Sequence, residues 1–147
     1  MKRLILIAFC ALTIGAHAQN IDRTFANVDG SLKLLGLTSI ERIQQEPFDS
    51  WYSKFYDSYE VGPEIASLAN LPDSITIFMG TWCGDSKREV PRFIKMLESI
   101  NYDLSKLKII NVNTGFQNYK QAPERQEAGQ YIYRVPTFIM HDADDKE

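Results

Sequence analysis

The chain of 147 residues has little cysteine and histidine, two of each. Cys10 and one histidine lie in an N-terminal segment that we expect to be removed, which leaves Cys83 and His141. One cysteine and one histidine cannot supply the four ligands of a structural zinc site, and a single thiol cannot form an internal disulfide. We therefore expect no metal site, no bound cofactor and one free thiol that requires a specific explanation.

Positive charge is also scarce. The 16 Lys and Arg residues face 19 Asp and Glu residues, a net charge of -3 at pH 7, and loss of Lys2 and Arg3 would lower it to -5. No part of the chain carries a block of basic residues. Because nucleic acids and anionic membrane surfaces are bound through such blocks, we expect neither as a partner.

Residues 1–18 have the pattern of a secretory signal peptide. A basic start precedes the uncharged run LILIAFCALTIGA, which is too short for a membrane span, and small residues at Ala16 and Ala18 follow. We predict cleavage after Ala18, export to the periplasm or the extracellular space, and no stable membrane insertion afterwards. An uncleaved anchor is the alternative, and a lipoprotein role for Cys10 is disfavoured by the bulky Phe9 before it.

The mature chain of about 129 residues is long enough for one domain with a sizeable core. Residues 19–61 are predicted to form an N-terminal extension with an aromatic helix, and within them the stretch SLKLLGL suits either a strand or a short helix. Six aromatic residues fall at helical spacing, and such a stripe is typical of a core face. They are Phe48, Trp51, Tyr52, Phe55, Tyr56 and Tyr59.

Residues 62–147 are predicted to form an α/β domain, a central mixed sheet flanked by helices. The β-branched run 74–79 ends at a glycine and predicts a buried strand, and residues 107–112 and 137–140 predict two more. A helix between the first two makes them parallel, and a further helix is expected after Pro123.

The stretch MGTWCGDSKREVP places Cys83 where a strand ends and a helix begins. The first N–H groups of a helix have no partner within it, and the helix dipole favours negative charge at that end. Both effects stabilise a thiolate at Cys83. Asp85 opposes this through like-charge repulsion, and Lys87 and Arg88 could offset it.

These residues resemble the thioredoxin superfamily, whose usual active site is W-C-G-P-C with a proline eight positions after the first cysteine, as Pro91 is here. The later stretch RVPTF resembles the family's cis-proline site. The resemblance implies a cis bond between Val135 and Pro136, packed against Cys83. It also implies that Trp82 and the backbone of Val135 contact a substrate chain, which would be added as a strand.

The chain departs from the family pattern in three ways. Ser86 replaces the second cysteine, and Ile77 stands where the family often has a buried acid. The chain also ends eleven residues after Pro136, so that the last strand and helix of the fold are missing. We expect a fragment, with an unprotected sheet edge as the alternative.

The resemblance implies thiol–disulfide exchange by a monothiol enzyme of the isomerase or deglutathionylase type, with Cys83 as nucleophile and Ser86 beside it. Its partners would be cysteine-containing proteins or low-molecular-weight disulfides, and an external thiol would act as co-substrate. The alternative is a non-catalytic module that binds peptides around Trp82, Val135 and Pro136. A hydrolase that pairs Cys83 with His141 is disfavoured, and the oligomeric state stays open.

Overall fold

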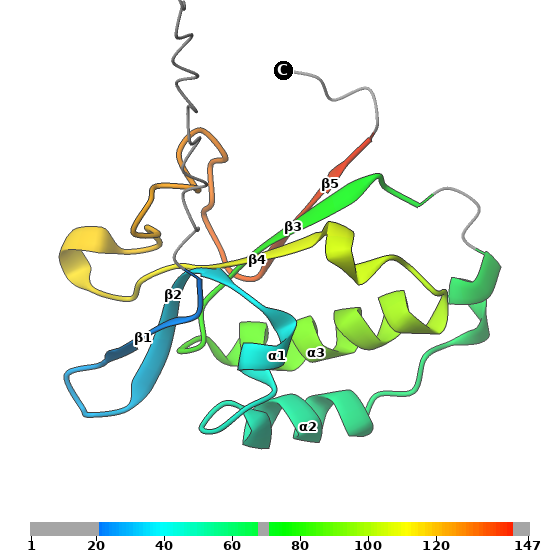
Figure 1. Cartoon of the computed structure of the whole chain (residues 1–147), viewed down its shortest axis with the longest axis horizontal. Helices are drawn as coiled ribbons and strands as arrows, with labels where there is room; N and C mark the ends of the chain where they lie inside the picture. Colours follow the sequence, from blue (N-terminus) through cyan, green and yellow to red (C-terminus); the bar gives the residue numbers. More distant parts are fainter. Residues whose placement is uncertain (1–20, 68–70, 143–147) are drawn as a thin grey trace, which may run out of the picture.

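The computed structural model describes residues 21–67 and 71–142 and forms a five-stranded mixed sheet with three α-helices on one of its faces (Figure 1). The predicted signal peptide lies outside the described residues. The strands are β1 (Arg23–Ala26), β2 (Leu32–Thr38), β3 (Ser74–Met79), β4 (Leu107–Asn111) and β5 (Thr137–His141). The helices are α1 (Ile40–Ile43), α2 (Asp49–Asp57) and α3 (Gly84–Ser99), and short 3-10 turns occur at Pro63–Ser67, Leu104–Lys106 and Phe116–Asn118.

The unit β3–α3–β4 agrees with the prediction from sequence. β3 and β4 pair in parallel with Ile77 opposite Ile109, and α3 connects them. β5 pairs with the other side of β3 in the antiparallel direction, with Phe138 opposite Ile77. The strand order is β1-β2-β4-β3-β5, which places β3 inside the sheet and β5 at the edge of its described part.

The segment predicted as a helical N-terminal extension also contributes to the sheet. The ambiguous stretch SLKLLGL forms β2, which pairs antiparallel with β1 and β4. A tight turn joins the two strands of this hairpin: the N–H of Asn27 donates to the carbonyl of Ser31 at 2.7 Å, and Gly30 adopts a φ of +81° that glycine tolerates best. The N-terminal region is therefore part of the same sheet and shares its core.

The main core lies between the sheet and the helices. Alternation along β3 directs Ile75 and Ile77 toward α3, where Val90 and Ile94 are fully buried. The aromatic stripe of α2 closes this core, as the sequence predicted, chiefly through Tyr52. Burial raises the pKa of Tyr52 to about 12, even though its hydroxyl accepts a hydrogen bond from Gln44.

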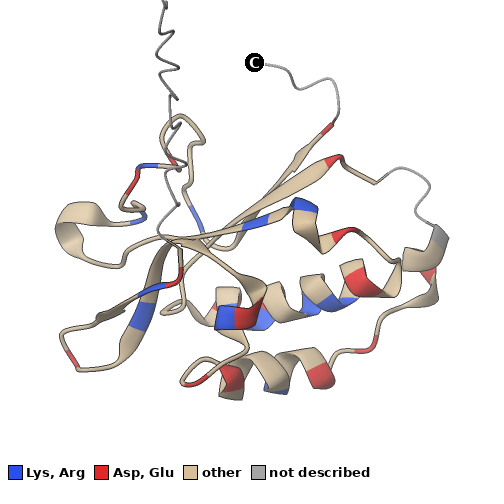
Figure 2. Cartoon of the chain, viewed as in Figure 1, with Lys and Arg blue, Asp and Glu red and all other residues tan. Residues whose placement is uncertain are grey.

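Charges are distributed over the helices in both signs, as Figure 2 shows for α2 and α3. Across the helix interface, the ammonium of Lys95 on α3 donates to the carbonyls of Tyr56 and Tyr59 at 2.8 Å each. These carbonyls lie at the C-terminal end of α2, where a cation is favoured. None of the helices in the part of the chain described here is long and apolar enough to cross a bilayer.

The helix predicted after Pro123 is not formed, and this prediction is wrong. The segment runs through successive turns, with bonds from the N–H of Arg125 to Ala122 and from that of Ala128 to Arg125. Arg125, Gly129 and Tyr131 all have positive φ, which interrupts a right-handed helix. The apolar parts of the segment, Ala122 and Ile132, instead pack on the sheet face opposite the helices.

The burial of β3 gives a first prediction. Ile77→Ala should lower the free energy of unfolding by about 2–5 kcal/mol, because the side chain is fully buried and leaves a cavity. Urea unfolding followed by circular dichroism measures this loss. Lys108→Ala, on the exposed surface of the neighbouring strand, serves as the control and should change stability by less than about 0.5 kcal/mol. Equal effects of the two substitutions would contradict the packing described.

Candidate functional site

Cys83 lies between β3 and α3 and occupies the N-cap position of α3, with no side-chain cap bond. Its backbone is held on both sides: its N–H donates to Gly80 at 2.9 Å, and its carbonyl accepts from Lys87 at 3.0 Å. The residue is half-buried and is the free cysteine of the described chain. The residue is therefore partly exposed and caps the N-terminal end of a sixteen-residue helix.

Val135 and Pro136 lie beside this thiol, although Val135 is 52 residues further along the chain. The bond between them is cis, and the Sγ of Cys83 donates to the carbonyl of Val135 at 3.3 Å. In this contact the thiol is the donor and the carbonyl oxygen is the acceptor. When the proton leaves, the carbonyl of Val135 loses its donor and becomes available to another N–H group.

Trp82 is positioned by contacts within the protein. Its indole N–H donates to the carbonyl of Val112 at 2.8 Å, and its ring packs against Tyr119 with centroids 5.9 Å apart. The ring also lies over Gly80, where an added Cβ would come within 2.5 Å of the indole. Only glycine, which has no side chain, leaves room for the indole at position 80. Gly80 therefore allows Trp82 to adopt this position next to Cys83.

Ser86 is fully buried and supports the turn. Its hydroxyl accepts a hydrogen bond from the N–H of Gly80 at 3.3 Å. The adjacent Thr81 likewise accepts from the N–H of Leu34 on β2 at 3.1 Å. Both hydroxyls accept backbone N–H groups and so connect the loop after β3 to neighbouring segments. Ser86 therefore has a structural contact, and it also lies one helical turn after Cys83.

The charges around the helix start are unevenly compensated. Arg88 donates to Glu89 at 2.5 Å and to Asp85 at 2.8 Å, and these two bonds raise the pKa of Arg88, with the larger effect from Glu89. Lys87 has no ion-pair partner among the residues that the structure describes. Of the two cations considered from the sequence, Lys87 is therefore the one whose charge is not already balanced by a carboxylate.

His141 lies at the far end of β5 from Pro136. At about 3.3 Å per residue, the strand separates the two by roughly 13 Å or more, and the imidazole Nε2 lies 3.2 Å from the hydroxyl of Thr76. This arrangement does not place His141 as a base for Cys83. In the residues covered by the structure, no three His, Cys, Asp or Glu side chains are grouped as metal ligands.

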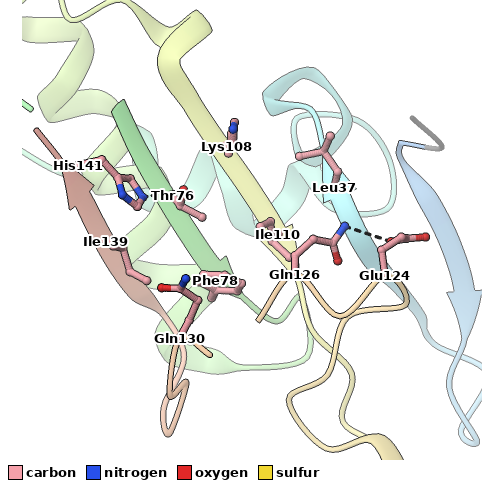
Figure 3. Close-up of a pocket in the computed structure, with 10 residues that line it drawn as sticks. All are labelled: Leu37, Thr76, Phe78, Lys108, Ile110, Glu124, Gln126, Gln130, Ile139 and His141. Atoms are coloured by element: carbon pink, nitrogen blue, oxygen red, sulfur yellow. Dashed lines mark hydrogen bonds between the residues drawn. The ribbon is translucent and has the colours of Figure 1, made fainter. Parts of the chain in front are cut away.

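A cavity of about 470 Å³ is located on the sheet face opposite the helices (Figure 3). Its floor is apolar, and its rim includes the bonded pair of Gln126 and Glu124, 3.1 Å apart. Sequence patterning did not predict it, because the segment that forms its rim was expected to be a helix. The lining residues are Leu37, Thr76, Phe78, Lys108, Ile110, Glu124, Gln126, Gln130, Ile139 and His141.

A second cavity, of about 710 Å³, adjoins the thiol site. The β1–β2 hairpin forms one wall, and Thr81, Trp82 and Lys87 form the other. Of the residues in these walls the sequence predicted only Trp82 as a substrate contact, and the hairpin was not recognised as a partner of the site. Gly30, in the tight turn between two apolar segments, is the signal that indicates such a hairpin.

Comparisons with known proteins return no match of this chain to a protein-family model, a curated protein or a solved structure. The interpretation of the site therefore depends on its geometry.

The contact of Ser86 gives a second prediction. Ser86→Ala removes the acceptor of the buried Gly80 N–H, and an unpaired buried donor costs about 1–3 kcal/mol. Urea unfolding should show a loss of that size. Ser99→Ala is the matched control on the same helix, because that serine is exposed and bonds only the local carbonyl of Met96. A Ser86 variant as stable as the Ser99 variant would show that the hydroxyl does not support the turn.

Proposed function

We propose that the chain is a thioredoxin-like protein that performs monothiol thiol–disulfide exchange through Cys83. The observation that carries the proposal is the half-buried thiol at the start of α3, 3.3 Å from the carbonyl oxygen of the cis Val135–Pro136 peptide bond. The parallel β3–α3–β4 unit and the antiparallel β5 support the assignment of the fold. The predicted signal peptide supports export to an oxidising compartment, where disulfides are available as substrates.

The proposed reaction begins when Cys83 loses its proton to solvent. The thiolate attacks one sulfur of a substrate disulfide, a bond forms between the Cys83 sulfur and that sulfur, and the substrate S–S bond breaks. The departing thiolate takes a proton from solvent. A second thiolate then attacks the mixed disulfide and releases Cys83, so that one disulfide is exchanged for another without net oxidation or reduction of the protein.

Ser86 does not take part in the second step of this scheme. A serine hydroxyl is not a nucleophile toward disulfides at neutral pH, and this one is buried and accepts from Gly80. Cys83 is the free cysteine in the described part of the chain, and in the proposed scheme an external thiol acts as the resolving thiol. This favours isomerisation and removal of small thiol adducts over net reduction.

The carbonyl of Val135 supplies a place for a polypeptide substrate. Once the thiol proton has left, this carbonyl can accept an N–H from an extended chain beside the mixed disulfide. The indole N–H of Trp82 is already bonded to Val112, so Trp82 offers the substrate only the free parts of its ring.

A non-catalytic binding module is the second candidate function. The hydrogen bond from the thiol of Cys83 to the carbonyl of Val135 supports the binding module, because a protonated thiol is a weak nucleophile. In this case Cys83→Ser would leave peptide binding unchanged. In thiol exchange the same substitution abolishes the covalent adduct.

The proposal predicts that iodoacetamide labels Cys83 in the native protein near neutral pH. The labelled residue is identified by mass spectrometry of the intact and digested protein. A small disulfide such as cystamine should form a mixed disulfide at the same residue, which a free thiol then removes. Native protein that stays unlabelled, while urea-unfolded protein reacts, would contradict a catalytic thiol and favour the binding module.

Ser86→Cys should introduce dithiol activity, because the new thiol lies one helical turn from Cys83 and can attack the mixed disulfide. The expected result is insulin reduction at least about tenfold faster than by the unchanged protein, which corresponds to about 1.4 kcal/mol of activation free energy. Ser99→Cys, on the same helix but remote from the turn, is the control and should reduce insulin no faster than the unchanged protein. Equal rates for all three proteins would contradict the proposed attack geometry.

A further inference from the structure

We infer that the cavity between the β1–β2 hairpin and Trp82, hereafter the hairpin cavity, binds the carboxylate of a small thiol or disulfide that reacts at Cys83. The hairpin cavity is lined on the hairpin side by Asn27, Asp29 and Lys33, and on the other by Thr81, Trp82 and Lys87. The choice of reacting atom rests on the proposed function, whereas the binding of the carboxylate rests on the charges of the cavity.

Lys33 is a largely buried residue on the cavity wall with no acid of the described chain beside its ammonium. The residue, on β2, is 9% exposed, and its ammonium donates to the amide oxygen of Asn113 at 2.8 Å. The same oxygen also accepts the backbone N–H groups of Thr114 and Gly115, so three donors share it. Within residues 21–67 and 71–142, no carboxylate pairs with Lys33. An ammonium on the cavity wall with no carboxylate partner attracts an anion into the cavity.

Lys87 brings a second cation to the same cavity from the opposite wall. It lies one helical turn after Cys83, with its N–H bonded to the carbonyl of that residue at 3.0 Å. The neighbouring Arg88 is held by two carboxylates, but Lys87 forms no ion pair in the described chain. The cavity thus has one uncompensated cation on the hairpin and one on α3.

Asp29 is the acidic residue on the wall. Its carboxylate accepts the hydroxyl of Ser31 at 2.6 Å and the N–H of the same residue at 3.0 Å, which lower the pKa of Asp29, so it is ionised at neutral pH. The carboxylate of Asp29 is therefore hydrogen-bonded within the hairpin turn. Two lysines and one aspartate leave the cavity with one net positive charge, which a single carboxylate neutralises.

The position of the cavity explains why the carboxylate should belong to a reactant of Cys83. Trp82 and Lys87 lie on either side of Cys83 in the chain and both line the cavity. Cys83 itself is not among the described residues that line the cavity, so a ligand anchored there by its carboxylate presents its sulfur to the thiol past Trp82 and Lys87. The volume of about 710 Å³ falls within the range of small-molecule sites, roughly 300–1,000 Å³.

Alkylation rates test this inference directly. Iodoacetate and iodoacetamide differ mainly in charge, so the ratio of their rates at Cys83, divided by the ratio for free cysteine, reports attraction of a carboxylate. Lys87→Gln should lower the normalised ratio about threefold, the size of an exposed ion pair, and Lys33→Met should lower it as well. Lys108→Gln, on the opposite sheet face, removes the same charge elsewhere and should leave the ratio unchanged. A ratio that neither cavity substitution changes would overturn the inference.

A second measurement separates this inference from the proposed function. Cys83→Ser protein cannot exchange disulfides, so titration with dithiodiglycolate, followed by NMR shifts of the Trp82 indole N–H, reports binding alone. We expect saturable binding that weakens about threefold in Lys87→Gln and is absent with the neutral diamide. Binding of this kind with an unreactive Cys83 would overturn the proposed function only. Absence of binding, with a reactive Cys83, would overturn the cavity inference only.

Discussion

The burial of β3 on both of its faces is the constraint on which the site depends. Ile75 and Ile77 pack toward the helices, and Phe78 packs toward the opposite face. A shift of the strand by one residue would exchange these faces, so its register is strongly specified. Because β3 lies between β4 and β5, its end is also fixed relative to Val135, which immediately precedes the cis bond that leads into β5. The meeting of Cys83 with Val135 is therefore a consequence of core packing.

The residues around the thiol are largely occupied in holding the turn. Ser86 accepts from Gly80, Thr81 accepts from Leu34, and the indole of Trp82 donates to Val112. The side chain of Cys83 also makes one hydrogen bond, to the carbonyl of Val135. Deprotonation therefore disturbs one contact and leaves the turn intact. The hydrogen bonds of Ser86, Thr81 and Trp82 thus support the turn independently of the thiol.

The sequence predicted the parts of the fold that depend on local pattern. The apolar run 74–79, the amphipathic helix after Cys83 and the aromatic stripe near Tyr52 were all recognised from periodicity. The helix expected after Pro123 was not formed, because turns and contacts with the sheet outweighed a weak helical pattern. The presence of Lys33 and Trp82 in the lining of one cavity could not be predicted, because it requires the β1–β2 hairpin to pack against a loop about 50 residues away.

In the proposed function, Ser86 in place of a second thiol and the charge of the hairpin cavity are explained together. A site with two cysteines holds its resolving thiol at a high effective concentration, because both belong to one chain. In the proposed reaction, a site with Ser86 must instead recruit that thiol from solution for every cycle. A cation such as Lys87 beside Cys83 raises the local concentration of acidic thiols and thereby replaces part of that advantage. Salt weakens the attraction between an exposed lysine and an acidic thiol. Because Lys33 is largely buried, salt screens its charge less than that of Lys87. In the proposed reaction, charge placement thus supplies to an external thiol part of what chain connectivity supplies to an internal one.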